Sequence, residues 1–175
     1  MISMLRTFAR CRRGVAAMEF ALVLPIGVVL LFGISEVSTA LLIDRKITRA
    51  THIGADLVAQ ETTMDNDKVA DLFTAMETIL VPFTPTNAYM RITSVWLNPD
   101  TNAVEVDWSV ARNGGPDSGN YVLPNGLITQ DGDSVIVAHV IYDHSPLFDG
   151  SGFGALTLED KAYLKPRRTT KVTGP

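Results

Sequence analysis

Apolar residues are concentrated near the start of the chain, where positions 20–34 hold only hydrophobic side chains, glycine and proline. Counted back to Val15, the run has 20 residues and one charge, at Glu19. A helix of 20 residues is about 30 Å long, which is the thickness of a bilayer's hydrocarbon core. The pattern therefore predicts a transmembrane helix over residues 15–34, and Pro25 with Gly27 should bend or loosen it.

A helical period continues beyond this span. Apolar or small residues recur at steps of three and four, while charged residues occupy the other faces. The positions in this stripe are Ile43, Ile47, Ala50, Gly54 and Leu57. One unbroken helix is thus expected from Val15 to about Gln60, and its outer half can pack on its own domain as well as on other subunits.

A second amphipathic helix is predicted after residue 64. Asp65 or Asn66 can cap its first turn, and Pro82 ends it. Its apolar face comprises Val69, Leu72, Phe73, Met76, Ile79 and Leu80. A stripe of this kind most often faces a core.

The spacing of apolar residues then changes to a period of two. Val104, Val106, Trp108 and Val110 alternate with polar residues, which predicts a strand with one buried face and one exposed face. The other strands are expected at residues 89–97 as its hairpin partner, at 135–142 as a central strand covered on both faces, and at 155–164. Residues 113–133, rich in Gly, Pro, Asn and Asp, should form a long exposed loop.

These elements define an α+β chain with a long N-terminal transmembrane helix, an amphipathic helix and a small antiparallel sheet of three or four strands. Its expected parts are a basic leader at 1–14, the span at 15–34, a continuation of the helix at 35–62 and an α+β domain at 63–175.

The distribution of charge orients the span. Four arginines and no acidic residue lie among the first 14 positions, and a basic flank stays in the cytoplasm, so the domain should lie across the membrane. Removal of these positions would leave 11 basic against 19 acidic residues, a net charge of −8, which argues against nucleic acid as a partner. The single cysteine, Cys11, also lies in the leader, so the domain must be stable without disulfides.

Glu19 is the unusual residue of the span, because a charge within a membrane normally has a partner. In one interpretation its carboxylate reaches back to the lipid headgroups or to Arg13. In the other, the chain is cut after Gly14, so that Val15 becomes a free amino terminus. Glu19 would then be the fifth residue and could pair with the terminal ammonium of a neighbouring subunit.

The sequence RGVAAMEFALVLP at residues 13–25 carries a resemblance to a known family. It resembles the N-terminal signature of the TadE-like pseudopilins of tight-adherence (Tad, Flp-type) pilus systems, and the likeness extends over roughly residues 12–50. Major pilins of these systems usually have tyrosine after the glutamate and are much shorter. Phe20 and the length of the chain therefore favour a minor pseudopilin.

This resemblance implies a pilin-like fold and a structural role in assembling a type IVc pilus for surface adhesion and biofilm formation. A prepilin peptidase would cut between Gly14 and Val15, and Glu19 with Phe20 would set subunit register. The protein would cross the bacterial inner membrane once, with its N-terminus cytoplasmic and its domain periplasmic, and would either enter the pilus or stay at its base. Its partners would be the peptidase, other pilins and pseudopilins, and TadG-like proteins.

Two other interpretations remain open. The N-terminal stretch could be a secretory signal peptide cut after Ala40, although Glu36 and the length of the apolar run count against this. In a different class of function, the span would only anchor a periplasmic binding module or enzyme unrelated to pili. That function would need a concave pocket with convergent polar groups.

The sequence predicts no enzymatic activity, cofactor, metal site or small-molecule substrate. It contains no serine-hydrolase elbow, phosphate-binding loop or zinc-protease histidine pair. His139 and His144 are an odd number of residues apart, so in one strand they would point to opposite faces and could not share a metal. His139 is therefore expected to be a structural residue with its hydrogen bonds satisfied.

Overall fold

The computed structural model describes residues 13–128, 130, 132–146 and 154–175. Positions 1–12 of the predicted leader, with three of its arginines, lie outside the described residues. The chain divides into two units, one of residues 1–39 with 146–154 and the other of residues 40–145 with 155–175.

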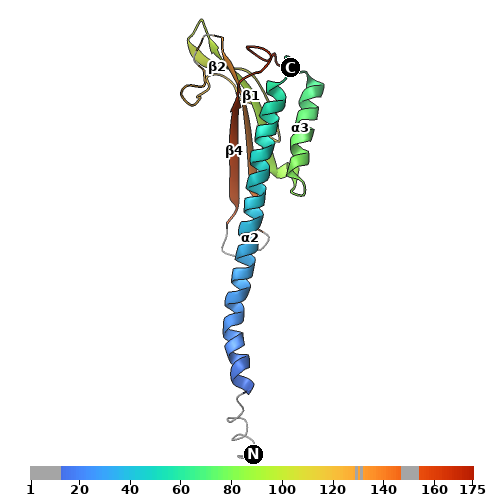
Figure 1. The fold of residues 1–175 in the computed structure, drawn as a ribbon, viewed down its shortest axis with the longest axis vertical. Coiled ribbons are helices and arrows are strands. Elements are labelled where there is room, and N and C mark those ends of the chain that lie inside the picture. The colour runs from blue at the N-terminus through green and yellow to red at the C-terminus, as the bar shows by residue number, and fades with distance from the viewer. Residues whose placement is uncertain (1–12, 129, 131, 147–153) are drawn as a thin grey trace, which may run out of the picture. The chain divides into compact units, whose positions relative to one another are not determined.

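The first unit consists, within the described residues, mainly of the N-terminal part of helix α2. This helix runs from Arg13 to Ala59 and has 47 residues, so the prediction of one continuous helix is confirmed (Figure 1). Pro25 lies inside it. Its residues from Ala40 onward belong to the second unit.

The second unit is an α+β domain, as the periodicity predicted. Helix α3 (Asn66–Leu80) is capped by Asp65, whose carboxylate accepts a hydrogen bond of 2.8 Å from the backbone N–H of Lys68. A short 3-10 helix, η1 (Pro85–Asn87), precedes the sheet. The four strands are β1 (Ala88–Asn98), β2 (Ala103–Arg112), β3 (Ser134–His144) and β4 (Leu156–Leu164).

All neighbouring strands of the sheet are antiparallel, in the order β2-β1-β3-β4. Strands β1 and β2 form the predicted hairpin, and β3 is a central strand. The long connection 113–133 carries the chain from β2 past β1 to β3. All four strands expected from the sequence therefore exist.

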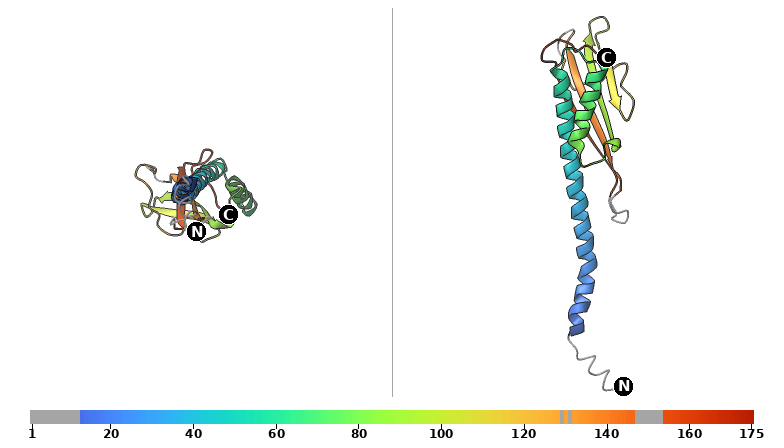
Figure 2. Two further views of the ribbon diagram at one scale, coloured as in Figure 1. Left: turned by 90° about the horizontal axis from the view of Figure 1, so that it is seen from below. Right: turned by 90° about the vertical axis from the view of Figure 1, so that its right-hand side faces the viewer.

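One face of the sheet packs against α3 and the C-terminal part of α2 (Figure 2). The helices approach each other closely at Gly54, where an added Cβ would lie 2.7 Å from the sulfur of Met76. Buried residues of α2 include Ile43, Ile47, Ala50 and Val58. Leu57 was predicted to belong to this stripe, but it is 41% exposed, because Val58 occupies the position that faces the core.

The other face of the sheet is covered by the 113–133 connection. Val95, Val135 and Val137 form a second core cluster. Side chains of the connection packed on it are Tyr121, Leu123, Leu127 and Ile128. The loop was predicted to be exposed, and it is a loop, but its apolar residues give β3 the cover on both faces that its sequence requires.

Strand β2 departs from the simple alternation predicted for it. The register with β1 shifts between Ser94 and Val95, so Trp108 lies opposite Ser94 whereas Val106 lies opposite Val95. The extra residue of this bulge turns Val104 and Val106 toward the loop cluster, while Trp108 and Val110 pack on the helix side. The prediction that all four residues share one buried face was therefore wrong.

The segment after β4 folds back onto the end of α2. The N–H of Arg167 donates to the carbonyl of Ala59 (2.8 Å), and the N–H of Met64 donates to the carbonyl of Thr173 (2.8 Å). Val172 is fully buried in the main core. Its carbonyl accepts a 2.8 Å hydrogen bond from the indole N–H of Trp108, so this segment connects the helices to strand β2.

Candidate functional site

The N-terminal part of α2 presents an apolar surface. Most large apolar side chains of residues 15–34 are between 40% and 71% exposed. Mean hydropathy reaches 2.4 over 18 residues, and none of that window is buried among the described residues. The helix is long and apolar enough to cross a membrane, which makes it a candidate membrane anchor.

The predicted cleavage and assembly residues lie at the start of this helix. Gly14 and Val15 are the second and third residues of α2, and Glu19 with Phe20 follows one turn later. All four are exposed, Phe20 to 65%. An added Cβ would meet no atom within 4 Å at Gly14 or at Gly27, so both glycines have open space around them.

The alternative cleavage site lies within the same helix. Residues 38–40 are helical, and the hydroxyl of Ser38 donates 2.7 Å to the carbonyl of Ile34 while that of Thr39 donates 3.0 Å to Ser35. Glu36, just before them, is buried to 4% exposure. Burying an acid is costly unless the acid is partnered, and no pattern in the sequence indicated that Glu36 would be buried.

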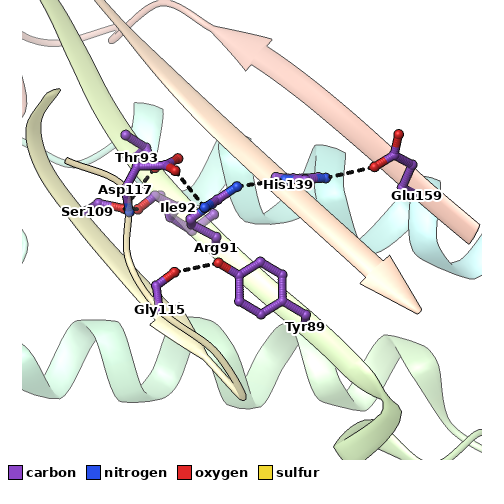
Figure 3. A network of polar contacts seen from close by, with 9 residues as sticks. All are labelled: Tyr89, Arg91, Ile92, Thr93, Ser109, Gly115, Asp117, His139 and Glu159. Atoms are coloured by element: carbon purple, nitrogen blue, oxygen red, sulfur yellow. Dashed lines mark hydrogen bonds and ion pairs between the residues drawn. The ribbon is translucent and has the colours of Figure 1, made fainter. Parts of the chain in front are cut away.

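A polar network lies on the sheet face that the 113–133 connection covers (Figure 3). The guanidinium of Arg91 on β1 forms an ion pair of 2.5 Å with Asp117 of the connection. Asp117 also accepts a 3.1 Å hydrogen bond from the hydroxyl of Thr93, and its N–H donates 2.9 Å to the hydroxyl oxygen of Ser109 on β2. These contacts attach the connection to two strands.

The same arginine continues the network across the sheet. Arg91 donates 3.1 Å to Nδ1 of His139 on β3, and Nε2 of His139 lies 3.3 Å from the carboxylate of Glu159 on β4. The guanidinium lies 5.3 Å from the centre of the Tyr89 ring, a cation–π contact. The hydroxyl of Tyr89 donates to the carbonyl of Gly115, so the aromatic side chain also holds the connection.

His139 is neutral in this network. Burial is the largest cause that lowers its pKa; the charges of Lys161 and Arg91 also lower it, and the hydrogen bond with Glu159 opposes them. Arginine can only donate, so Nδ1 of His139 must accept and the ring proton lies on Nε2, directed at Glu159. The prediction of a structural histidine with satisfied hydrogen bonds is confirmed.

The geometry of the network is that of a structural clamp. The hydroxyl of Ser109 is engaged by Thr93 and by the N–H of Asp117, and no described hydrogen bond joins it to His139. The network thus lacks the contact between a hydroxyl nucleophile and its base that covalent catalysis uses. Nor does the described part of the chain bring three or more His, Cys, Asp or Glu residues together in a way that could hold a metal ion.

The fold and the exposed apolar helix together define an α+β protein with a candidate membrane anchor. Residues 14–56 match the family model described as TadE-like protein, so this part of the chain is a TadE-like segment. The predicted resemblance is confirmed over that range, and it relates the chain to the structural proteins associated with Tad pili. Neither the curated proteins nor the solved structures contain a match to the chain.

Sequence reasoning did not single out Arg91, Asp117 or Tyr89. A signal for two of them was present, because Tyr89, Arg91 and Thr93 alternate with apolar residues on a strand. A polar row on a strand with strands on both sides needs partners. No pattern in residues 113–133 identified Asp117 as the partner, since that contact spans a loop of irregular backbone.

Proposed function

We propose that this protein is a minor pseudopilin that takes part in assembling a tight-adherence pilus. The observation that carries the proposal is the match of residues 14–56 to the TadE-like family. It is supported by the single continuous helix, which leads from an apolar anchor into a folded domain. In this proposal residues 1–14 lie in the cytoplasm and the α+β domain in the periplasm, which the basic flank of the span supports.

In this proposal a prepilin peptidase cuts between Gly14 and Val15. The new ammonium of one subunit pairs with the Glu19 carboxylate of another, which offsets the cost of placing either charge in an apolar environment. Phe20 packs beside this pair, and Pro25 with Gly27 adjusts the helix within the membrane. The domain then contacts other pilins, pseudopilins and TadG-like proteins.

The cleavage step is tested by the mass and N-terminal sequence of the protein recovered from membranes with and without the peptidase. A peptidase-dependent start at Val15 is expected. Gly14→Val should leave the chain uncut, whereas Gly27→Val, at another glycine with open space around it, should be cut normally. A start at Leu41 would instead establish signal peptidase cleavage, and an uncut wild-type chain would favour a simple anchor.

The pairing of Glu19 is tested separately by piliation. Glu19→Ala should be cut at Val15 yet reduce piliation strongly, because the terminal ammonium loses its partner. Glu19→Asp keeps the charge and should retain part of the function, while Leu22→Ala, a neutral change in the same segment, should have little effect. Normal piliation by a cleaved Glu19→Ala chain would remove the pairing role and leave the cleavage proposal intact.

A further inference from the structure

A groove of about 260 Å³ lies between the end of α2 and the N-terminal half of α3. Its floor is apolar and includes Leu57, Met64, Leu72 and Ala75. Leu57 is 41% exposed although it is a large apolar side chain next to the core. An exposed apolar groove of this kind is suited to receive side chains of another molecule.

The surroundings of the groove are acidic. Lys68 on its rim is already engaged, because its ammonium donates 2.7 Å to Glu61 and 3.0 Å to the carbonyl of Thr63. Asp67 and Asp71 are exposed on α3, four residues apart. No described hydrogen bond or ion pair joins either of these two carboxylates to the rest of the described chain, so both are free for a cation.

A complementary surface lies on α2. Leu41 and Leu42 are 54% and 53% exposed. Arg45 and Arg49 follow at helical spacing on the same side and are also exposed, and His52 continues the stripe. Within the described residues no ion pair or hydrogen bond engages the side chains of Arg45 or Arg49. The stripe therefore has an apolar end and an unneutralised basic part.

We propose that the stripe of one copy of this chain docks into the groove of a second copy. Arg45 faces Asp71 and Arg49 faces Asp67, while the two leucines pack near Ala75. The spacing fits, since both pairs of charges are four residues apart, or about 6 Å along a helix. The directions fit as well, because α3 runs back along α2, so an α2 parallel to that of its neighbour is antiparallel to the neighbour's α3 (Figure 1).

The contact requires the two copies to be staggered. Gly54 of α2 lies against Met76 of α3, and the long side chain of Lys46 reaches the carbonyls of Ile79 (2.9 Å) and Val81 (2.6 Å) at the end of α3. Counting back five residues from Met76 places Asp71 near residue 59 of α2. Arg45 of the second copy must therefore be raised by about 14 residues, or about 21 Å.

Because the two surfaces are different, a pair keeps one free groove, on the copy whose stripe is bound, and one free stripe, on the copy whose groove is filled. Such a heterologous contact repeats from copy to copy and builds a row unless a rotation closes it. This inference does not rest on cleavage at Gly14 or on the pilus role, since it concerns surfaces of the α+β domain alone.

The test uses purified full-length chain in detergent micelles, where no bilayer holds two helices at one depth. In a Cys11→Ser background, one preparation carries Arg49→Cys and a second, differently tagged, carries Asp67→Cys. Mild oxidation of the mixture should give the mixed disulfide dimer in excess over either homodimer. The matched control replaces Asp67→Cys by Asp100→Cys, at another exposed aspartate far along the chain.

Charge reversal gives an independent measurement. Arg45→Glu with Arg49→Glu, or Asp67→Lys with Asp71→Lys, should each weaken self-association roughly tenfold in sedimentation, and a mixture of the two variants should recover it. High salt should weaken the wild-type contact. Equal crosslinking of the Asp67 and Asp100 pairs, or reversed variants that associate as the wild type does, would overturn the proposal.

Discussion

At the scale of single residues, His139 makes the stability of the domain depend on pH. Its pKa is lowered in the folded chain, mainly by burial. Below pH 6.5, the ordinary pKa of histidine, the unfolded chain therefore binds a proton more readily than the folded one. The contribution of His139 is complete above that pH and is lost as the pH falls toward the folded-state pKa. Protonation would also turn Nδ1 into a donor facing the guanidinium of Arg91.

We expect His139→Gln to flatten this dependence. Urea unfolding of the full chain in detergent, followed by circular dichroism on both sides of pH 6.5, should show a smaller loss of stability on acidification than in the wild type. His52→Gln changes an exposed histidine on α2 and should leave the wild-type slope unchanged. An unaltered slope in His139→Gln would mean that other groups carry the pH dependence.

At the scale of secondary structure, α3 depends on its cap. The Asp65 carboxylate satisfies the N–H of Lys68, one of the donors that a helix leaves open at its start. Asp65→Ala should cost about 1 kcal/mol of the free energy of unfolding, measured by urea titration of the full chain. Thr78→Ala removes an exposed side chain farther along α3 whose described hydrogen bond is to the helix's own carbonyl at Thr74, and it should change stability by less than about 0.5 kcal/mol. Equal losses in the two variants would exclude a specific capping effect.

The sequence predicted the elements well where a period continued without interruption. α2 and α3 follow from a repeat of 3.6, because each buries one constant side, and β3 follows from an apolar run, because it is buried on both faces. In β2 the bulge breaks this periodicity. One extra residue, Asp107, puts Val106 and Trp108 on opposite faces of the sheet, although apolar and polar residue types continue to alternate through them. Local periodicity cannot reveal a shift that is defined by the partner strand.

Contacts distant in sequence were the least predictable part. Tyr121 and Leu127 cover one face of the sheet, and Val172 packs in the core on the other face. All three residues lie in segments with no regular structure of their own. The candidate site shows the same division. Gly14, Val15 and Glu19 were found because their spacing is a local signature, whereas Arg91 and Asp117 meet only after the sheet has formed.

At the scale of the whole molecule, the segment after β4 should determine whether helices and sheet unfold together. Val172 is fully buried, so Val172→Ala should lower the free energy of unfolding by about 2 kcal/mol. Thr173→Ala changes an exposed side chain whose described contacts are made by the backbone, and it should have little effect. Urea unfolding of both variants, compared with the wild type, measures the difference. A Val172→Ala chain as stable as Thr173→Ala would show that the segment adds nothing to the core.

Helix α2 has a mechanical consequence, since it carries both the apolar segment and one side of the domain core without an intervening linker. A pulling force on the apolar segment is transmitted along the helix backbone to the core contacts of Ile43 and Ile47. A load along the helix axis strains these contacts together, in shear, instead of peeling them apart one at a time. Because α2 continues from one into the other, a force that raises the apolar segment also raises the folded domain.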